Sequence, residues 1–133
     1  MIPTSDKPRS GIYVDVQNIY YTTRQIYKRQ FNYRALWEHL AKSTNISIAI
    51  AYAVDRGIAD QQKFQSALRY IGFEVKLKPY ISRSDGSSKG DWDVGITIDI
   101  LDYAPKSDIV VLASGDGDFD LLIQKIIFNN KVL

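Results

Sequence analysis

The sequence has no cysteine, a single histidine and only two glutamates among its 133 residues. The absence of cysteine excludes a disulfide framework and thiolate metal sites, and it fits a cytoplasmic protein. A Ser-His-Asp arrangement would depend on His39 alone, which lies inside a predicted helix. No apolar run approaches the roughly 20 residues that span a membrane, so we expect no membrane segment.

Aspartate supplies nearly all of the negative charge: thirteen of the fifteen acidic residues are Asp, and only Glu38 and Glu74 are Glu. Glutamate is the better helix former, whereas aspartate is favoured at helix caps and turns. Many of the aspartates should therefore lie at the ends of elements, where loops build sites. The net charge of +2 is too small to indicate a class of partner.

Apolar patterning predicts strands that alternate with helices. Short apolar runs indicate strands at Ile12–Val16, Ile46–Val54, Phe73–Ile81, Asp108–Ala113 and Lys131–Leu133. Apolar residues at helical spacing indicate helices at Tyr33–Lys42, Asp60–Ile71, Trp92–Tyr103 and Phe119–Phe128, with Gly72 as a C-cap. This alternation predicts an α/β fold with a mostly parallel sheet of about five strands, covered by helices on both faces.

The chain length fits one domain. We expect residues 1–10 to be a flexible N-terminal segment and residues 11–133 to form the domain, with its last strand cut short at the chain end. The segment that follows the first strand, as far as Gln30, is polar and aromatic, and Ser82–Gly90 is expected to be a loop.

Acidic residues follow two of the predicted strands at the edge where sites in parallel sheets lie. Asp15 lies within the first strand, close to Asn18, and the strand ending at Ala113 runs into Ser114, Asp116, Asp118 and Asp120. A carboxylate inside an apolar strand costs several kcal/mol unless it is paired or bound to metal. Asp15 could instead accept hydrogen bonds from a turn, and either Asp116 or Asp118 could cap the next helix. Three aspartates in five residues exceed what capping needs.

A third contribution comes from the helix that begins near Trp92. At about 100° per residue, Asp93 and Thr97 fall inside an arc formed by the apolar residues of this helix. We therefore expect Asp93 to point inward, and we expect Asp99 and Asp102, on the opposite side, to be solvated.

Asp15, Asp93, Asp116 and Asp118 could thus converge at one sheet edge. Carboxylates a few ångströms apart repel one another unless a cation compensates them. Oxygen ligands alone favour Mg²⁺ or Mn²⁺ over zinc. An EF-hand is excluded, because the run that begins at Asp116 has Leu121 and Ile127 where Gly and Glu are required.

Three motifs surround these residues: Ile-Tyr-Val-Asp15-Val-Gln-Asn18, Lys89-Gly-Asp-Trp-Asp93-Val with Asp99, and Ser114-Gly-Asp116-Gly-Asp118-Phe119. In this order and spacing they resemble the motifs of the NYN domain, in its LabA-like branch, a relative of PIN-domain nucleases. The resemblance covers essentially the whole chain.

The resemblance implies a three-layer Rossmann-like α/β/α fold and a metal-dependent ribonuclease-like activity. It makes Asp15, Asp93, Asp116 and Asp118 the catalytic and metal-binding acids. Asn18 and Ser114 would support the site, and the family pattern also has an acid at Asp99. Thr97 and Asp120 are kept as further supporting residues, although Asp120 is not a firm part of the pattern.

Basic and aromatic residues gather in two segments near the expected strand ends, with Arg24, Lys28 and Arg29 in one and Lys89 in the other. Cations interleaved with rings suit single-stranded nucleic acid, although an ordinary solvated face has the same composition. The resemblance favours RNA.

Three functions are consistent with these patterns. The first is a Mg²⁺- or Mn²⁺-dependent ribonuclease acting on single-stranded RNA. The second is a catalytically weak or inactive domain that serves as an RNA-binding or regulatory protein-interaction module. The third is another Mg²⁺ phosphohydrolase, which lacks support because Val16 and Gln17 follow Asp15 where one large class needs D-x-D. A homodimer is one option for the assembly.

Overall fold

The computed structural model describes residues 7–27, 31–55, 59–79, 81–82, 88–89, 92–114 and 131–132. Helices and strands alternate along these ranges. In chain order the elements are β1 (Arg9–Asp15), α1 (Val16–Tyr27), α2 (Tyr33–Ser43), β2 (Asn45–Asp55), α3 (Ala59–Ile71), β3 (Glu74–Pro79), β4 (Ile81–Ser82), β5 (Ser88–Lys89), α4 (Asp93–Tyr103), the 3₁₀ helix η2 (Ala104–Lys106), β6 (Ile109–Ala113) and β7 (Lys131–Val132).

The main sheet is parallel, with the strand order β3-β2-β1-β6-β7. Four of these strands are longer, and β7 adds two residues. This arrangement confirms the predicted α/β class and the mostly parallel sheet. The central strand β1 is buried along all but its first residue, as a parallel strand covered on both faces should be. β3 forms one edge of the sheet, and Lys76 and Lys78 interrupt its apolar pattern.

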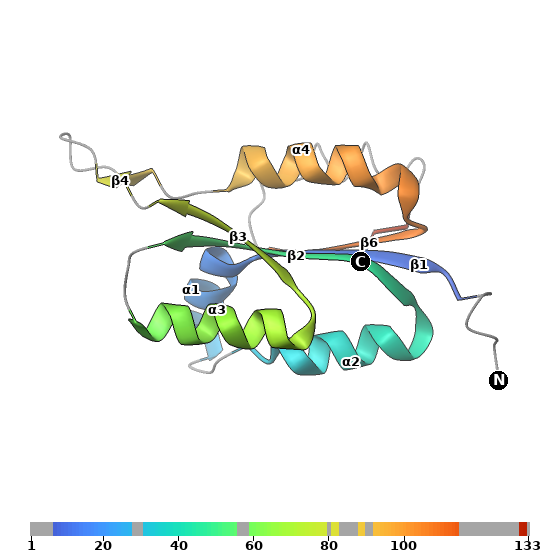
Figure 1. Cartoon of the computed structure of the whole chain (residues 1–133), viewed down its shortest axis with the longest axis horizontal. Coiled ribbons are helices and arrows are strands. Elements are labelled where there is room, and N and C mark those ends of the chain that lie inside the picture. Colours follow the sequence, from blue (N-terminus) through green and yellow to red (C-terminus); the bar gives the residue numbers. More distant parts are fainter. Residues whose placement is uncertain are drawn as a thin grey trace.

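The sheet lies between two layers of helices (Figure 1): α4 covers one face, and α1, α2 and α3 cover the other. Side chains alternate between the faces along each strand. Tyr13 packs with Ile96 and Ile100 on the α4 face, whereas Ile12 and Val14 join the core on the opposite face. None of the helices in the described ranges is long and apolar enough to cross a membrane.

Gly72 ends α3 as the sequence predicted. Its φ of 136° lies in the region that favours glycine, and the backbone N–H groups of Gly72 and Phe73 both donate to the carbonyl of Leu68. A Cβ at this position would also lie 2.6 Å from a ring atom of Trp37. The turn therefore needs glycine for its conformation and for its packing.

Three local features differ from the expectations. β1 begins at Arg9, three residues before the strand expected from Ile12, and Ser10 is fully buried. The polar, aromatic segment after β1 forms helix α1, which its composition did not reveal. The expected loop after Ile81 contains a short antiparallel pair between β4 and β5.

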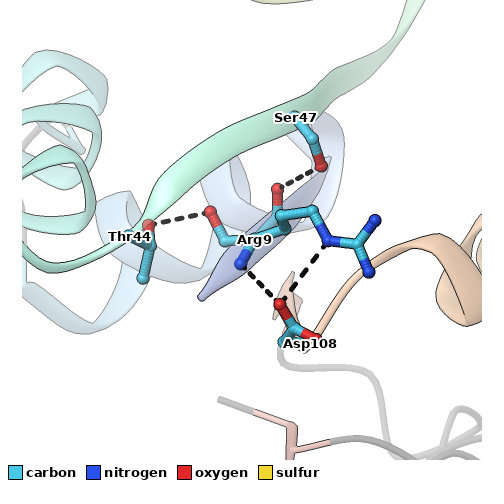
Figure 2. Close-up of polar contacts among 5 residues, drawn as sticks. Arg9, Thr44, Ser47 and Asp108 are labelled. Carbon is cyan, nitrogen blue, oxygen red and sulfur yellow. Dashed lines mark hydrogen bonds and ion pairs between the residues drawn. The ribbon is translucent and has the colours of Figure 1, made fainter. Parts of the chain in front are cut away.

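The amino edge of the sheet is closed by polar contacts (Figure 2). Arg9 and Asp108 exchange hydrogen bonds, from the Arg9 N–H to Asp108 Oδ2 and from the Asp108 N–H to the Arg9 carbonyl, both 2.8 Å long. The Arg9 side chain adds an exposed ion pair at 3.6 Å. The bond from the Arg9 N–H is the main reason that the pKa of Asp108 is lowered. These contacts tie β1 to β6 at the end opposite Asp15.

Candidate active site at the carboxyl edge of the sheet

Asp15 is the last residue of β1 and is 7% exposed. Its Oδ1 atom accepts a 3.4 Å hydrogen bond from the backbone N–H of Asn18, in the first turn of α1. This geometry is that of a helix N-cap, although the bond is long. Burial, and after it the charge of Asp15, raises the pKa of Tyr33 on α2. Asp15 therefore has a structural role as the cap of α1, and its negative charge acts on a tyrosine of the core.

Asp15 belongs to a row of register partners that crosses the sheet. It pairs with Tyr52 on β2, and Tyr52 pairs with Lys76 on β3. On the other side, Val14 pairs with Ala113, so that Ser114 follows β6 next to the end of β1. Partners in parallel strands point to the same face, and Tyr52 packs in the core beneath α4. Tyr52 and Lys76 of this row therefore lie on the face that α4 covers, and Asp15 stands at the end of its strand, where it caps α1.

Trp92 anchors the start of α4 at the carboxyl edge. Its indole N–H donates a 2.7 Å hydrogen bond to the carbonyl of Ala53 near the end of β2, and its ring lies 5.3 Å from the ring of Tyr52. Lys78 Nζ lies 5.3 Å from the Trp92 ring centroid. A Cβ on Gly95 would lie 2.6 Å from the Trp92 ring. The indole is thus packed against the first turn of its own helix.

The face of α4 that was predicted from the sequence to be buried is only partly the face that is buried in the structure. Ile96 and Ile100 are fully buried, but the other apolar residues of the expected arc are exposed: Val94 (70%), Ile98 (54%) and Leu101 (40%). Apolar residues occur around most of this helix, so the centre of its buried face could not be located from their positions. Asp102 is exposed, as expected.

Asp99 points inward, whereas solvation was expected. Its Oδ2 atom accepts hydrogen bonds from Tyr52 Oη at 2.8 Å and from Lys76 Nζ at 2.7 Å. The Asp99 side chain is 15% exposed and that of Lys76 is 31% exposed. The hydrogen bond to Asp99 is the main cause of the raised pKa of Lys76. Burial, and then the bond to Asp99, raises the pKa of Tyr52. Lys76 therefore compensates the charge of Asp99.

Asp93 begins α4 and is half-buried. The helix lies across β1, and its Asp99 flank contacts β2 and β3. By helical periodicity, Asp93 and Thr97 lie on the opposite flank, toward β6. The Thr97 hydroxyl donates a 2.8 Å hydrogen bond to the carbonyl of Asp93. Asp15, Asp93 and Ser114 are thus carried to one edge of the sheet by three different elements.

The remaining predicted site residues lie outside the described parts. Asp116, Asp118, Asp120, Lys28 and Arg29 fall outside the described ranges, and Arg24 and Lys89 are described only by the backbone of α1 and β5. Within the described ranges, no group of three or more Asp, Glu or His side chains could hold a metal ion. A metal site with three or more acidic protein ligands at this edge would therefore need a contribution from residues outside the described ranges. The sequence analysis did not identify Tyr52 and Trp92 as residues that shape this edge. The spacing of Trp92 and Gly95, three residues apart on one helix, could have indicated that the indole packs against the glycine.

The fold and this edge define the class of protein: a three-layer α/β domain with a parallel sheet and acidic residues at the carboxyl edge of that sheet. The NYN domain family matches residues 9–132, and the chain belongs to this family. It is 30% identical over 124 residues to "Low amplitude and bright protein LabA" of Synechococcus elongatus, in an alignment that covers 87% of this chain and 66% of that protein. The chain thus spans slightly less than two thirds of the length of this relative.

The fold is also similar to a crystal structure of a protein of unknown function from Vibrio parahaemolyticus. The two share 47% sequence identity and superpose with a TM-score of 0.89, over 98% of this chain and 82% of that one. The family match and the similarity to the LabA protein confirm the LabA-like NYN resemblance. Family membership supports a ribonuclease-like or RNA-related function, and nuclease-like domains of this family generally use divalent metals.

Proposed function

We propose that this domain is a Mg²⁺- or Mn²⁺-dependent endoribonuclease that hydrolyses single-stranded RNA at the carboxyl edge of the sheet. The observation that carries the proposal is the position of Asp15. A nearly buried carboxylate ends the central strand, beside the strand that leads to Ser114 and at the same edge of the sheet as the start of the helix that carries Asp93.

The donor chemistry at this edge fits a hard cation. Asp15 and Asp93 offer carboxylate oxygens, and no thiolate is present in the sequence. Asp116 follows Ser114 by two residues, so the covalent chain limits the separation of their Cα atoms to about 7 Å. We propose Asp15, Asp93, Asp116 and Asp118 as the ligand set. A bound divalent ion would lower the pKa of a water molecule and compensate the charge of the phosphate.

The protein itself would position the RNA. The first N–H groups of α4, next to Asp93, favour an anion such as a phosphate. Asn18 and Ser114 flank Asp15 and can orient a water molecule or a ligand oxygen by hydrogen bonding. The basic residues Arg24, Lys28, Arg29 and Lys89 would hold the sugar-phosphate backbone.

Incubation of end-labelled single-stranded RNA with Mn²⁺, Mg²⁺ or EDTA tests the proposal. We expect cleavage with metal and none with EDTA. Asp93→Asn and Asp116→Asn should each reduce the rate by at least roughly a hundredfold, since a ligand should matter no less than its supporting residues. Asp102→Asn is the matched control for Asp93→Asn, because it makes the same change at an exposed position of the same helix. Its rate should equal that of the wild type.

The alternative is an RNA-binding or regulatory module without catalysis. One observation favours it: Asp15 caps α1, so this acid has a structural reason to be present without chemistry. RNA binding with no cleavage under any metal would support the module over the nuclease.

A further inference from the structure

Helix α4 is held on the sheet from one flank. Trp92 and Asp99 are seven residues apart, nearly two turns at about 3.6 residues per turn, and therefore lie on the same side of the helix. Trp92 contacts Ala53 and Tyr52, and Asp99 contacts Tyr52 and Lys76. Tyr52 is fully buried and takes part in both attachments. These two attachments restrain the rotation of α4 about its own axis.

The rotation of α4 determines the direction of Asp93. Asp93 follows Trp92 directly, so its side chain leaves the helix about 100° further around the axis. With the Trp92–Asp99 side held against β2 and β3, Asp93 lies on the flank toward the ends of β1 and β6. The packing of Ile96 and Ile100 alone would restrain this angle less, because other apolar residues of α4 could take their place in the core.

We propose that Asp99 is a positioning residue: held by Lys76 and Tyr52, it sets the rotation of α4 and thereby directs Asp93 toward the candidate metal site. This role rests on the proposed function, since it gives Asp99 an effect on a metal that it does not ligate. The compensation of Asp99 by Lys76, 2.7 Å away, supports this role over that of a ligand.

The sign of the effect of Lys76→Met on Mn²⁺ affinity distinguishes a positioning role of Asp99 from a direct effect of its charge on the metal. Removal of a nearby positive charge should by itself strengthen the binding of a cation. A positioning role predicts the opposite, because Asp99 loses its partner and α4 loses its restraint. We expect Lys76→Met and Asp99→Asn both to weaken Mn²⁺ binding by roughly tenfold, as for other residues that orient metal ligands. Lys76→Arg, which keeps the cation, should retain nearly wild-type affinity.

Arg9→Met is the matched control, because it removes the cation of the Arg9–Asp108 ion pair at the opposite edge. It makes the same change in net charge and should leave Mn²⁺ affinity unaltered. Affinities would be measured by calorimetric titration, and folding by circular dichroism. If Lys76→Met binds Mn²⁺ as tightly as the wild type or more tightly while Asp99→Asn weakens it, Asp99 acts through its own charge and the proposal is overturned.

A second measurement does not depend on metal. The sequence has no cysteine, so nitroxide labels can be attached at Ile98→Cys on α4 and Lys42→Cys on α2, both exposed positions. We expect Lys76→Met to shift or broaden the distance distribution between the labels and Arg9→Met to leave it unchanged. If the wild type binds no Mn²⁺, the proposed function fails while the labels still test the restraint. An unchanged distribution in Lys76→Met would refute the positioning role.

Discussion

Asp15 and Tyr52 are register partners at the carboxyl edge of the sheet, one on β1 and the other on β2. Tyr52 also donates to Asp99 and contacts Trp92, both of which hold α4. A single buried tyrosine therefore links the strand that ends in Asp15 to the helix that begins with Asp93. The geometry of the candidate site depends on this packing as well as on the acids themselves.

The first prediction separates the charge of Asp15 from its capping role. Asp15→Asn keeps an oxygen that can accept from the Asn18 N–H and removes a buried charge, so we expect the metal-free protein to become more stable. Asp15→Ala also loses the cap and should be less stable than Asp15→Asn by about 1 kcal/mol. Both variants should bind Mn²⁺ more weakly. Urea denaturation in EDTA measures the stabilities, and an Asn variant less stable than the wild type would show that the carboxylate itself is structural.

The second prediction concerns Gly95. Alanine is the better helix former by roughly 0.5–1 kcal/mol, but its Cβ would lie 2.6 Å from the Trp92 ring. We expect Gly95→Ala to displace the indole, lower stability by about 1–2 kcal/mol and weaken Mn²⁺ binding. Thermal unfolding and indole fluorescence would detect these changes. Ile98→Ala, on the exposed side of the same helix, is the control and should have a smaller effect on both. A gain of stability in Gly95→Ala would show that Trp92 moves aside freely.

The third prediction concerns alkaline pH. Burial, and then the charge of Asp99, raises the pKa of Tyr13 from 10.0 to about 12. Because the folded pKa is the higher one, the stability that depends on neutral Tyr13 is present below pH 10.0 and is lost as the pH rises toward about 12. Tyr13→Phe should therefore lose less stability over this interval than the wild type, as measured by urea denaturation from neutral pH upward.

The same variant has an expected effect at neutral pH. The Tyr13 hydroxyl is buried and has no hydrogen-bond partner within the described ranges. Its removal should leave stability unchanged or raise it by up to about 1 kcal/mol. A clear loss of stability at pH 7 would show that this hydroxyl is hydrogen-bonded in solution, for example to a buried water molecule.

The fourth prediction concerns the cleavage products. Attack by water on phosphorus needs no 2′-hydroxyl group and should leave a 5′-phosphate and a 3′-hydroxyl. RNA with methylated 2′-hydroxyls should still be cut, provided that the site accommodates the methyl groups. Mass spectrometry of the fragments distinguishes these ends, and a 2′,3′-cyclic phosphate would contradict the mechanism.

The fifth prediction concerns RNA binding. Replacement of Arg24, Lys28 and Arg29 by alanine should weaken binding to a similar extent for RNAs of different sequence and reduce its dependence on salt. Fluorescence anisotropy at several salt concentrations measures both effects. A loss of affinity for one sequence alone would indicate that these residues contact bases instead of phosphates.

The class of fold could be predicted from local patterns. Apolar runs marked the strands, and their alternation with helices implied a parallel sheet, because strands joined by helices run in the same direction. Helix α1 was not predicted in this way, although Val16, Ile19 and Ile26 recur at helical spacing, and Val16 and Ile19 pack against the core. The polar and aromatic residues between them obscured this pattern.

The sequence by itself determined which acids follow the strands, and therefore where a site should be sought, because the carboxyl ends of parallel strands meet at one edge. Tertiary structure alone decided the rotation of α4 and the role of Asp99. Apolar residues occur around most of this helix, so its own periodicity allows several buried faces. The choice among them comes from Tyr52 and Lys76 on strands β2 and β3, which are distant in sequence and meet Asp99 only in the folded protein.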